Sequence, residues 1–102
     1  GCVIKGGTMH FEFVCEGVTH GIKDLNVLSD VPVIFCLLTD NTEQQSIERS
    51  GGEHGNKGTE AAIAAIKMAF LRQQSSLNHL ENQNLLNEGT LQIEGGPLKL
   101  KE

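Results

Sequence analysis

Aromatic residues are scarce in this sequence. Among its 102 residues there is no Trp and no Tyr, and the aromatic content consists of four Phe. A hydrophobic content of 38% is sufficient for one small domain with a core of modest size. Because that core has to be built from Val, Ile, Leu and Ala, the composition favours layered α/β packing over a small all-β sandwich.

Basic residues are also few, and they form no cluster. Eight Lys and Arg are dispersed against thirteen Asp and Glu, which gives a formal net charge of −5. This balance argues against a nucleic-acid-binding surface, so phosphate recognition would be local and directed at a small molecule. Long hydrophobic runs are missing too, because the longest, residues 31–38, is far below bilayer length. We therefore expect no membrane-spanning segment.

The three cysteines form no Cys-x-x-Cys pair. Cys2, Cys15 and Cys36 are odd in number and stand in apolar stretches, which is typical of buried free thiols in a reducing compartment, the cytoplasm or a plant plastid. The four histidines lack metal-site spacing with these cysteines, so we expect no metal. No signal peptide precedes the first apolar run, and a sequence without an initial Met is expected to begin partway through a domain.

The first eleven residues hold the pattern around which the chain is organised. Residues 2–4 are an apolar run, Gly6 and Gly7 supply a turn, and Thr8 is the expected N-cap of a following helix. Such a helix start presents unpaired backbone N–H groups at the positive end of a dipole and can hold a phosphate. His10 would lie beside that anion as a proton carrier, because imidazole titrates near neutrality. The alternative is an ordinary turn and cap with no chemical role.

An amphipathic helix and an apolar strand are predicted next. Residues 10–25 repeat apolar side chains at three- and four-residue steps, which indicates a helix. Residues 31–38 are continuously apolar and rich in β-branched side chains, which predicts a strand covered on both faces. Strand, helix and strand make a right-handed βαβ unit, and ligands bind beyond the carboxyl ends of such strands. Residues 6–10 and 39–42 are therefore expected to share one edge.

A short helix from about residue 42 to residue 50 is also predicted. Thr42 and Gln45 have the spacing of a capping box that would open it. Arg49 stands near its end, where two interpretations remain open. It is either a solvated cation that complements the helix dipole or an anion ligand, whose planar fork suits phosphate well.

The last third of the sequence changes in composition. An alanine-rich segment over residues 59–71 is the strongest predicted helix. Residues 74–102 are polar and show no core, so we expect a tail that is disordered or forms a short hairpin around residues 95–97. The expected organisation is one domain over residues 1–73, followed by this tail.

Four segments together resemble the 6,7-dimethyl-8-ribityllumazine synthase family. They occur in the family's order and at about its spacing: VIKGGTMHFEF at 3–13, VPVIF at 31–35, EQQSIERSG at 43–51 and HGNKGTEAA at 54–62. The resemblance covers roughly residues 1–72. It is specific because four separate motifs agree and none alone would decide it.

The resemblance implies a transferase of riboflavin biosynthesis. It would condense 5-amino-6-(D-ribitylamino)uracil with 3,4-dihydroxy-2-butanone 4-phosphate and release water and phosphate, without metal or cofactor. The position of His10 matches the family's proton donor and shuttle, Gly7 and Thr8 match the backbone cradle of the butanone phosphate, and Arg49 matches the arginine that clamps it. The residues matched to the ribitylaminouracil site are Cys2, Val3, Ile4, Phe35 and Lys57, and Glu48 matches the acidic neighbour of the arginine.

The resemblance also implies an architecture. The family has a three-layer flavodoxin-like sandwich around a parallel sheet, and this sequence resembles its carboxy-terminal part, with two strands and three helices before an irregular tail. Family members assemble as pentamers or multiples of pentamers with active sites at subunit interfaces, so a homo-oligomer is expected. The alternatives are an inactive fragment, a ligand-binding or assembly subunit that keeps the phosphate turn, and an unrelated flavodoxin-like domain. Residues 91–98 faintly resemble the family's amino-terminal segment, which leaves a permuted or duplicated chain as a further alternative.

Overall fold

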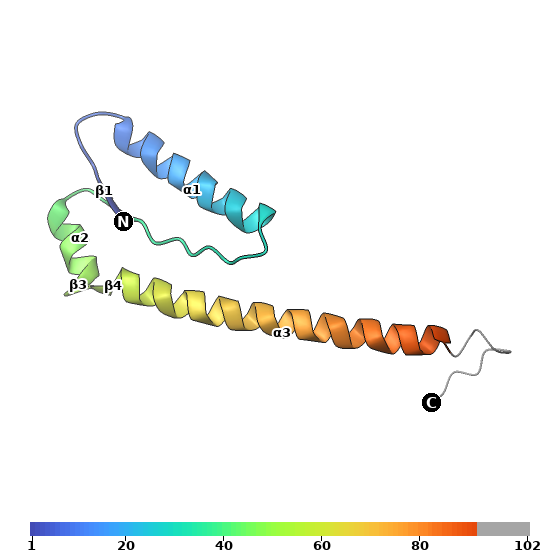
Figure 1. Cartoon of the computed structure of the whole chain (residues 1–102). Helices are drawn as coiled ribbons and strands as arrows, with labels where there is room; N and C mark the ends of the chain where they lie inside the picture. Colours follow the sequence, from blue (N-terminus) through green and yellow to red (C-terminus); the bar gives the residue numbers. More distant parts are fainter. Residues whose placement is uncertain (92–102) are drawn as a thin grey trace. The chain divides into compact units, whose positions relative to one another are not determined.

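The computed structural model describes residues 1–91, with side-chain surroundings for residues 1–88. Its elements, labelled in Figure 1, are β1 (Cys2–Ile4), α1 (His10–Leu28), β2 (Leu38–Asp40), α2 (Glu43–Arg49), β3 (Ser50–Gly52), β4 (Gly55–Asn56) and α3 (Lys57–Leu91). The chain divides into two units, Gly1–Ala69 and Phe70–Glu102, and every strand in the described residues belongs to the first. The fold is mixed α/β, as the composition predicts, with one parallel and one antiparallel strand pair.

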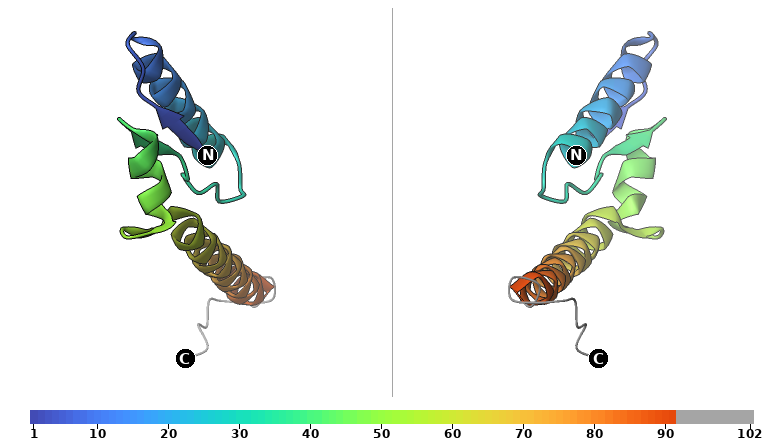
Figure 2. Two further views of the ribbon diagram at one scale, coloured as in Figure 1. Left: turned by 90° about the vertical axis from the view of Figure 1, so that its left-hand side faces the viewer. Right: turned by 90° about the vertical axis from the view of Figure 1, so that its right-hand side faces the viewer.

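Strands β1 and β2 lie side by side and run parallel (Figure 2), with Ile4 opposite Asp40. The pairing continues one residue beyond β1, where the backbone N–H of Lys5 donates to the carbonyl of Asp40 at 2.9 Å. The carboxyl ends of both strands therefore meet at one edge. This confirms the predicted edge shared by residues 6–10 and 39–42, where ligand sites form in parallel sheets.

The second strand is shorter than the apolar run predicts. It begins at Leu38, and residues 32–37 before it are not in a strand, so the predicted strand over residues 31–38 is wrong in its bounds. The reason is register: Leu38 lies opposite Cys2, and the residues before Leu38 face no strand within residues 1–91. The Asn26 side chain bonds this segment instead. Its amide donates to the Val33 carbonyl at 2.7 Å, and its oxygen accepts from the Val33 N–H at 2.9 Å.

Helix α1 begins at His10 as predicted and ends at Leu28 rather than at residue 25. Its N-cap is Met9, so the prediction of Thr8 as N-cap is wrong by one residue. The Thr8 hydroxyl nevertheless accepts a long hydrogen bond of 3.4 Å from the N–H of His10. It therefore still stands beside the first backbone donor of the helix.

Helix α2 starts with the predicted capping box, which is confirmed. The Thr42 hydroxyl accepts from the backbone N–H of Gln45 at 3.3 Å, and the Gln45 side chain accepts from the N–H of Thr42 at 3.2 Å. The same Gln45 oxygen accepts from the N–H of Asn41 at 2.8 Å. These bonds satisfy donors that a helix start leaves unpaired, and they fix the turn from β2 into α2.

A small antiparallel pair, β3 and β4, follows α2 and was not predicted. Two glycines allow its turns, because Gly51 has φ of 118° and Gly55 has φ of 87°, where other residues are strained. Gly52 is required for a different reason: a Cβ there would lie 2.7 Å from the Cα of Glu48. This close approach holds the strand pair against the last turn of α2.

Helix α3 extends from Lys57 to Leu91, well beyond the predicted helix over residues 59–71. The irregular tail predicted from residue 74 is therefore wrong as far as residue 91. Polarity indicates a segment without a core, but Gln, Leu and Glu have good helix propensity and need no core to form backbone bonds. The predicted hairpin lies outside the described residues, and the domain boundary near residue 73 stays a prediction.

Few side chains of the first unit are fully buried. Among the described residues, Leu38 is the buried hydrophobic residue, and Asp40 and Ser46 are the buried polar ones. Apolar side chains on α1 remain open, with Phe13 68% exposed and Leu28 85% exposed. The buried centre is thus the junction of β2 with α2. None of the helices within residues 1–91 has an apolar stretch long enough to cross a bilayer.

Candidate functional site at the carboxyl edge of the parallel strands

The carboxylate of Asp40, the last residue of β2, is the centre of a polar cluster. The residue is only 6% exposed, yet both oxygens have partners. The Ser46 hydroxyl donates to Oδ2 at 2.8 Å, and Nη1 of Arg49 donates to Oδ1 at 2.8 Å. The hydrogen bond from Ser46, followed by the bond and charge of Arg49, lowers the pKa of Asp40 against the opposing effect of burial. Helix α2 therefore keeps this buried carboxylate ionised.

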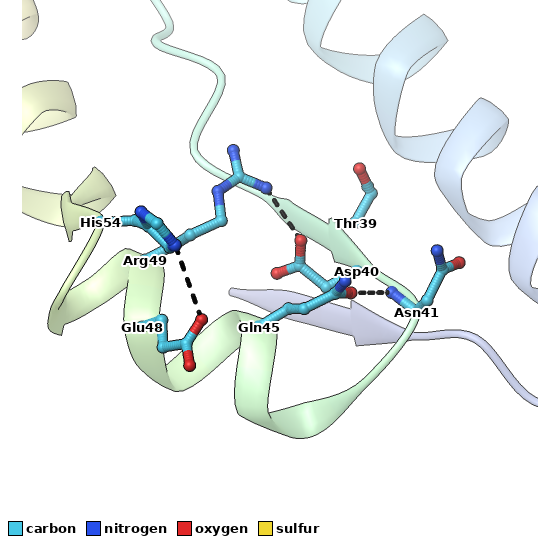
Figure 3. A pocket seen from close by; sticks show the side chains of 7 residues that line it. All are labelled: Thr39, Asp40, Asn41, Gln45, Glu48, Arg49 and His54. Atoms are coloured by element: carbon cyan, nitrogen blue, oxygen red, sulfur yellow. Dashed lines mark hydrogen bonds and ion pairs between the residues drawn. The ribbon is translucent and has the colours of Figure 1, made fainter.

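An open hollow of about 410 Å³ lies beside this cluster (Figure 3). Its lining comes from β2, the turn after it, α2 and the turn between β3 and β4: Thr39, Asp40, Asn41, Gln45, Glu48, Arg49 and His54. In Figure 3 the Arg49 side chain reaches from the end of α2 towards Asp40 at the end of β2. The hollow thus lies at the edge where β1 and β2 both end.

The Arg49 guanidinium is paired through one nitrogen and remains partly exposed. Its Nη1 pairs with Asp40, while 43% of its side chain is exposed and it lines the hollow. The sequence left two interpretations of Arg49 open, a solvated cation and an anion ligand. The structure shows its guanidinium anchored to a buried carboxylate. Because the guanidinium carries five N–H donors, it can hold this partner and still donate to a phosphate or carboxylate.

A second pair of titratable groups lines the same hollow. The His54 imidazole lies in the turn between β3 and β4, with Nε2 at 3.8 Å from Oε2 of Glu48. The backbone N–H of His54 also donates to the carbonyl of Glu48 at 2.9 Å, and the Gln44 amide donates to the Glu48 carboxylate at 3.2 Å. This pair gains an ionic attraction only when His54 is protonated.

The turn between β1 and α1 is braced by an ion pair. Nζ of Lys5 lies 3.0 Å from Oε1 of Glu12 and 5.9 Å from the centre of the Phe11 ring. The hydrogen bond from Lys5 is the main reason that the pKa of Glu12 is lowered. These contacts connect the end of β1 to the first turn of α1 and so fix both ends of residues 6–9.

Of the predicted site residues, a first group belongs to residues 1–10, Arg49 lines the hollow, and Phe35 and Lys57 lie elsewhere. The first group consists of residues on β1 or just after it: Cys2, Val3, Ile4, Gly7, Thr8 and His10. Arg49 lines the hollow directly, and the parallel register brings Ile4 and the turn after it to the same edge, whereas Cys2 lies opposite Leu38 at the start of β2. His10 is exposed at the start of α1, and an added Cβ at Gly7 would meet no atom of the described residues within 4 Å. The backbone at this turn is therefore accessible.

Phe35 and Lys57 lie apart from the hollow lining. Phe35 is 39% exposed in the extended segment before β2. The neighbouring Cys36 thiol donates to the carbonyl of Lys57 at 3.7 Å, which brings this segment to the start of α3. The Lys57 amine itself lies 3.7 Å from the carboxylate of Glu60. The structure thus brings the Phe35 segment and Lys57 together, but it does not bring them into the hollow.

Sequence reasoning missed Asp40 and Ser46, and it gave His54 no role. The signal for Asp40 was present, since it is a charged residue two positions after the apolar run over residues 31–38, at the edge where ligand sites form. Ser46 carried no comparable signal. Its role depends on how α2 packs against the end of β2, which the local sequence does not specify.

These features define an α/β protein with an arginine-centred polar hollow at the carboxyl edge of a parallel strand pair. Comparison with known families is specific: the family described as 6,7-dimethyl-8-ribityllumazine synthase matches residues 1–73. The chain belongs to this family. The resemblance inferred from four motifs is thereby confirmed.

Curated relatives bearing this name align along the chain. The one from Flavobacterium psychrophilum is 76% identical over 102 residues, and the one from Flavobacterium johnsoniae is 71% identical over 102 residues. In both, the alignment covers 100% of this chain and 54% of the relative. The relative from Christiangramia forsetii is 72% identical over 75 residues, which is 74% of this chain and 45% of that protein. The chain spans about half the length of the curated relatives it matches.

Proposed function

We propose that the protein carrying this chain is a 6,7-dimethyl-8-ribityllumazine synthase. It condenses 5-amino-6-(D-ribitylamino)uracil with 3,4-dihydroxy-2-butanone 4-phosphate and releases water and phosphate, without metal or cofactor. The observation that supports this most strongly is the parallel register of β1 and β2, with Ile4 opposite Asp40. Through it, the turn after β1 and the Asp40–Arg49 pair belong to one edge, where a phosphorylated substrate can be held.

The phosphate of the butanone substrate is assigned to Gly7, Thr8 and Arg49. The backbone at Gly7 is open, and α1 starts just beyond it with unpaired N–H groups at the positive end of its dipole. Arg49 adds a full positive charge. Positive charge and N–H donors on a departing phosphate stabilise the charge that develops during its elimination.

His10 is assigned the proton transfers. Imine formation and phosphate elimination both need an acid or base that works near neutrality, which imidazole provides. His10 is the first residue of α1 and is exposed, so a substrate bound at the turn can reach its ring. The ribitylaminouracil is assigned to a second group of residues, namely Cys2, Val3, Ile4, Phe35 and Lys57, with Glu48 beside Arg49.

The proposed assembly is a homopentamer or a multiple of pentamers, in which each site is shared by neighbouring subunits. Each subunit would have a three-layer flavodoxin-like fold. The exposed apolar side chains of α1 support it, because Phe13, Leu25 and Leu28 are each more than half exposed. Apolar surface of this extent is favourably covered by further elements of the fold and by adjacent subunits. A native mass measurement tests the assembly, and a monomer of the whole protein would contradict it.

The activity is tested on the chain alone and on a whole protein in which the chain replaces the matching segment of the Flavobacterium psychrophilum relative. Product absorbance and phosphate release are followed with both substrates present. We expect turnover by the whole protein. If the whole protein binds both substrates without turnover, the enzyme assignment is contradicted and a ligand-binding subunit is favoured.

His10→Ala tests the proton-transfer role. The variant should slow turnover by about 100-fold or more while substrate affinity stays close to that of the wild type. His20→Ala is the matched control, since His20 is also exposed on α1 but is assigned no role. Equal rates for His10→Ala and the wild type would remove His10 from the mechanism.

A further inference from the structure

We infer that Asp40 and Ser46 are positioning residues that hold the Arg49 guanidinium ready for the phosphate of the substrate. This inference rests on the proposed function and adds to it two residues that the family resemblance does not assign. It is carried by the geometry of the buried carboxylate at the end of β2.

Both oxygens of the Asp40 carboxylate are bound from one helix. Ser46 and Arg49 are three residues apart on α2 and therefore share the helix face that contacts the end of β2. Ser46 binds Oδ2 and Arg49 binds Oδ1, each at 2.8 Å. Asp40 and Ser46 are each only 6% exposed. A buried carboxylate bound at both oxygens cannot rotate, so the direction from which it receives Arg49 is fixed.

The anchored guanidinium gains preorganisation from this arrangement. A free arginine side chain loses much rotamer freedom when it binds a ligand, and that loss weakens binding. Here the freedom is already restricted, because Nη1 is bound to Asp40 while 43% of the Arg49 side chain remains exposed beside the hollow. The remaining N–H donors are available to an anion. An arriving phosphate therefore meets a group that is already oriented.

The charge of Asp40 has an effect on phosphate affinity that is opposite to the effect of positioning. Its negative charge lies behind Arg49 and repels an incoming anion, so removing that charge alone would strengthen phosphate binding. Ser46 separates the two effects. Ser46→Ala leaves the Asp40 charge and removes only the hydroxyl that orients Oδ2, whereas Asp40→Asn removes the charge and weakens the anchor. Positioning predicts weaker phosphate binding in both variants, while a dominant charge effect predicts tighter binding in Asp40→Asn.

The test measures inorganic phosphate binding by titration calorimetry and steady-state kinetics on the whole protein described above. We expect Asp40→Asn and Ser46→Ala to raise the Kd for inorganic phosphate by about three- to tenfold. The KM for the butanone phosphate should rise by a similar factor, and kcat should fall by no more than that factor because Arg49 also supports the departing phosphate. The KM for the ribitylaminouracil should stay within about twofold. Asp24→Asn, an exposed aspartate paired with Lys23 on α1, is the matched control and should change neither constant.

A double-mutant cycle shows whether the effect passes through Arg49. In an Arg49→Ala background, Asp40→Asn should change phosphate affinity less than twofold, because the group that it positions is gone. An undiminished effect in that background would overturn the inference. Unchanged or tighter phosphate binding in Asp40→Asn and Ser46→Ala would also overturn it. Ser46→Ala removes a single hydroxyl, so it preserves the test if either charge variant fails to fold.

The outcome is separable from that of the proposed function. If the wild type turns over substrate and both variants bind phosphate as it does, the positioning role is wrong and the function stands. If the wild type binds phosphate without turnover and both variants bind it more weakly, the positioning role is supported and the enzyme assignment is contradicted.

Discussion

Replacing Gly52 with alanine should displace the end of α2 and destabilise the fold. The added Cβ would lie 2.7 Å from the Cα of Glu48 and 3.0 Å from the carbonyl oxygen of Ile47. Ordinary van der Waals contact begins at about 3.4 Å, so the backbones have to separate by about 0.7 Å. Both neighbours are backbone atoms, which cannot move away by a side-chain rotation. Overpacking of this kind costs about 1–3 kcal/mol.

The measurement is denaturant unfolding of the whole protein at a fixed protein concentration, with wild type, Gly52→Ala and Gly21→Ala compared. Gly21 lies within α1, and an added methyl there meets no atom of the described residues within 4 Å. That variant should therefore gain about 0.5–1 kcal/mol from better helix propensity. Arg49 follows Glu48, so phosphate affinity should also fall in Gly52→Ala. A Gly52→Ala protein as stable as wild type would refute the close approach of β3 to α2.

Two further predictions concern α2 and its buried carboxylate. Thr42→Ala removes the acceptor of the capping box and should lower the free energy of unfolding by about 0.5–2 kcal/mol. Thr42→Ser keeps a hydroxyl acceptor and should therefore have nearly the stability of the wild type. The pKa of Asp40 is lower in the folded state than its ordinary value of 3.8, so the ionised carboxylate stabilises the fold at any pH above 3.8. This stabilisation is lost as the pH falls from 3.8 to the lowered pKa. The difference in unfolding midpoint between wild type and Asp40→Asn should therefore shrink on acidification below pH 4, and a constant difference between pH 7 and pH 3 would contradict it.

Local signals predicted the start of α1, the start of α2 and the shared strand edge. The Thr42 and Gln45 box is a short-range pattern, and its bonds form between residues three positions apart. The edge follows from the strand–helix–strand order, which favours parallel strands whose carboxyl ends coincide. Each of these features depends on few residues, and the sequence specifies those residues directly.

Features that depend on partners could not be predicted in the same way. An apolar run indicates that a segment can be a strand, but its length as a strand depends on the neighbour it pairs with, and β2 begins only opposite Cys2. The Asn26 bonds to Val33 are likewise invisible in a hydrophobicity pattern, because they join a helix end to an extended segment seven residues later. Ser46 is hidden for the same reason: its partner is set by packing.

The Asp40 pair changes how phosphate binding by Arg49 has to be understood. If the guanidinium left Asp40, a carboxylate that is only 6% exposed would lose its charge partner, which is strongly unfavourable. Arg49 must therefore keep this bond while a ligand binds and leaves, and the ligand shares the guanidinium with Asp40. A lysine, with one compact charge, could not serve both partners in fixed directions, whereas the planar fork of arginine can. Affinity would then come from orientation more than from net positive charge, which is consistent with a phosphate site on a chain whose formal net charge is −5.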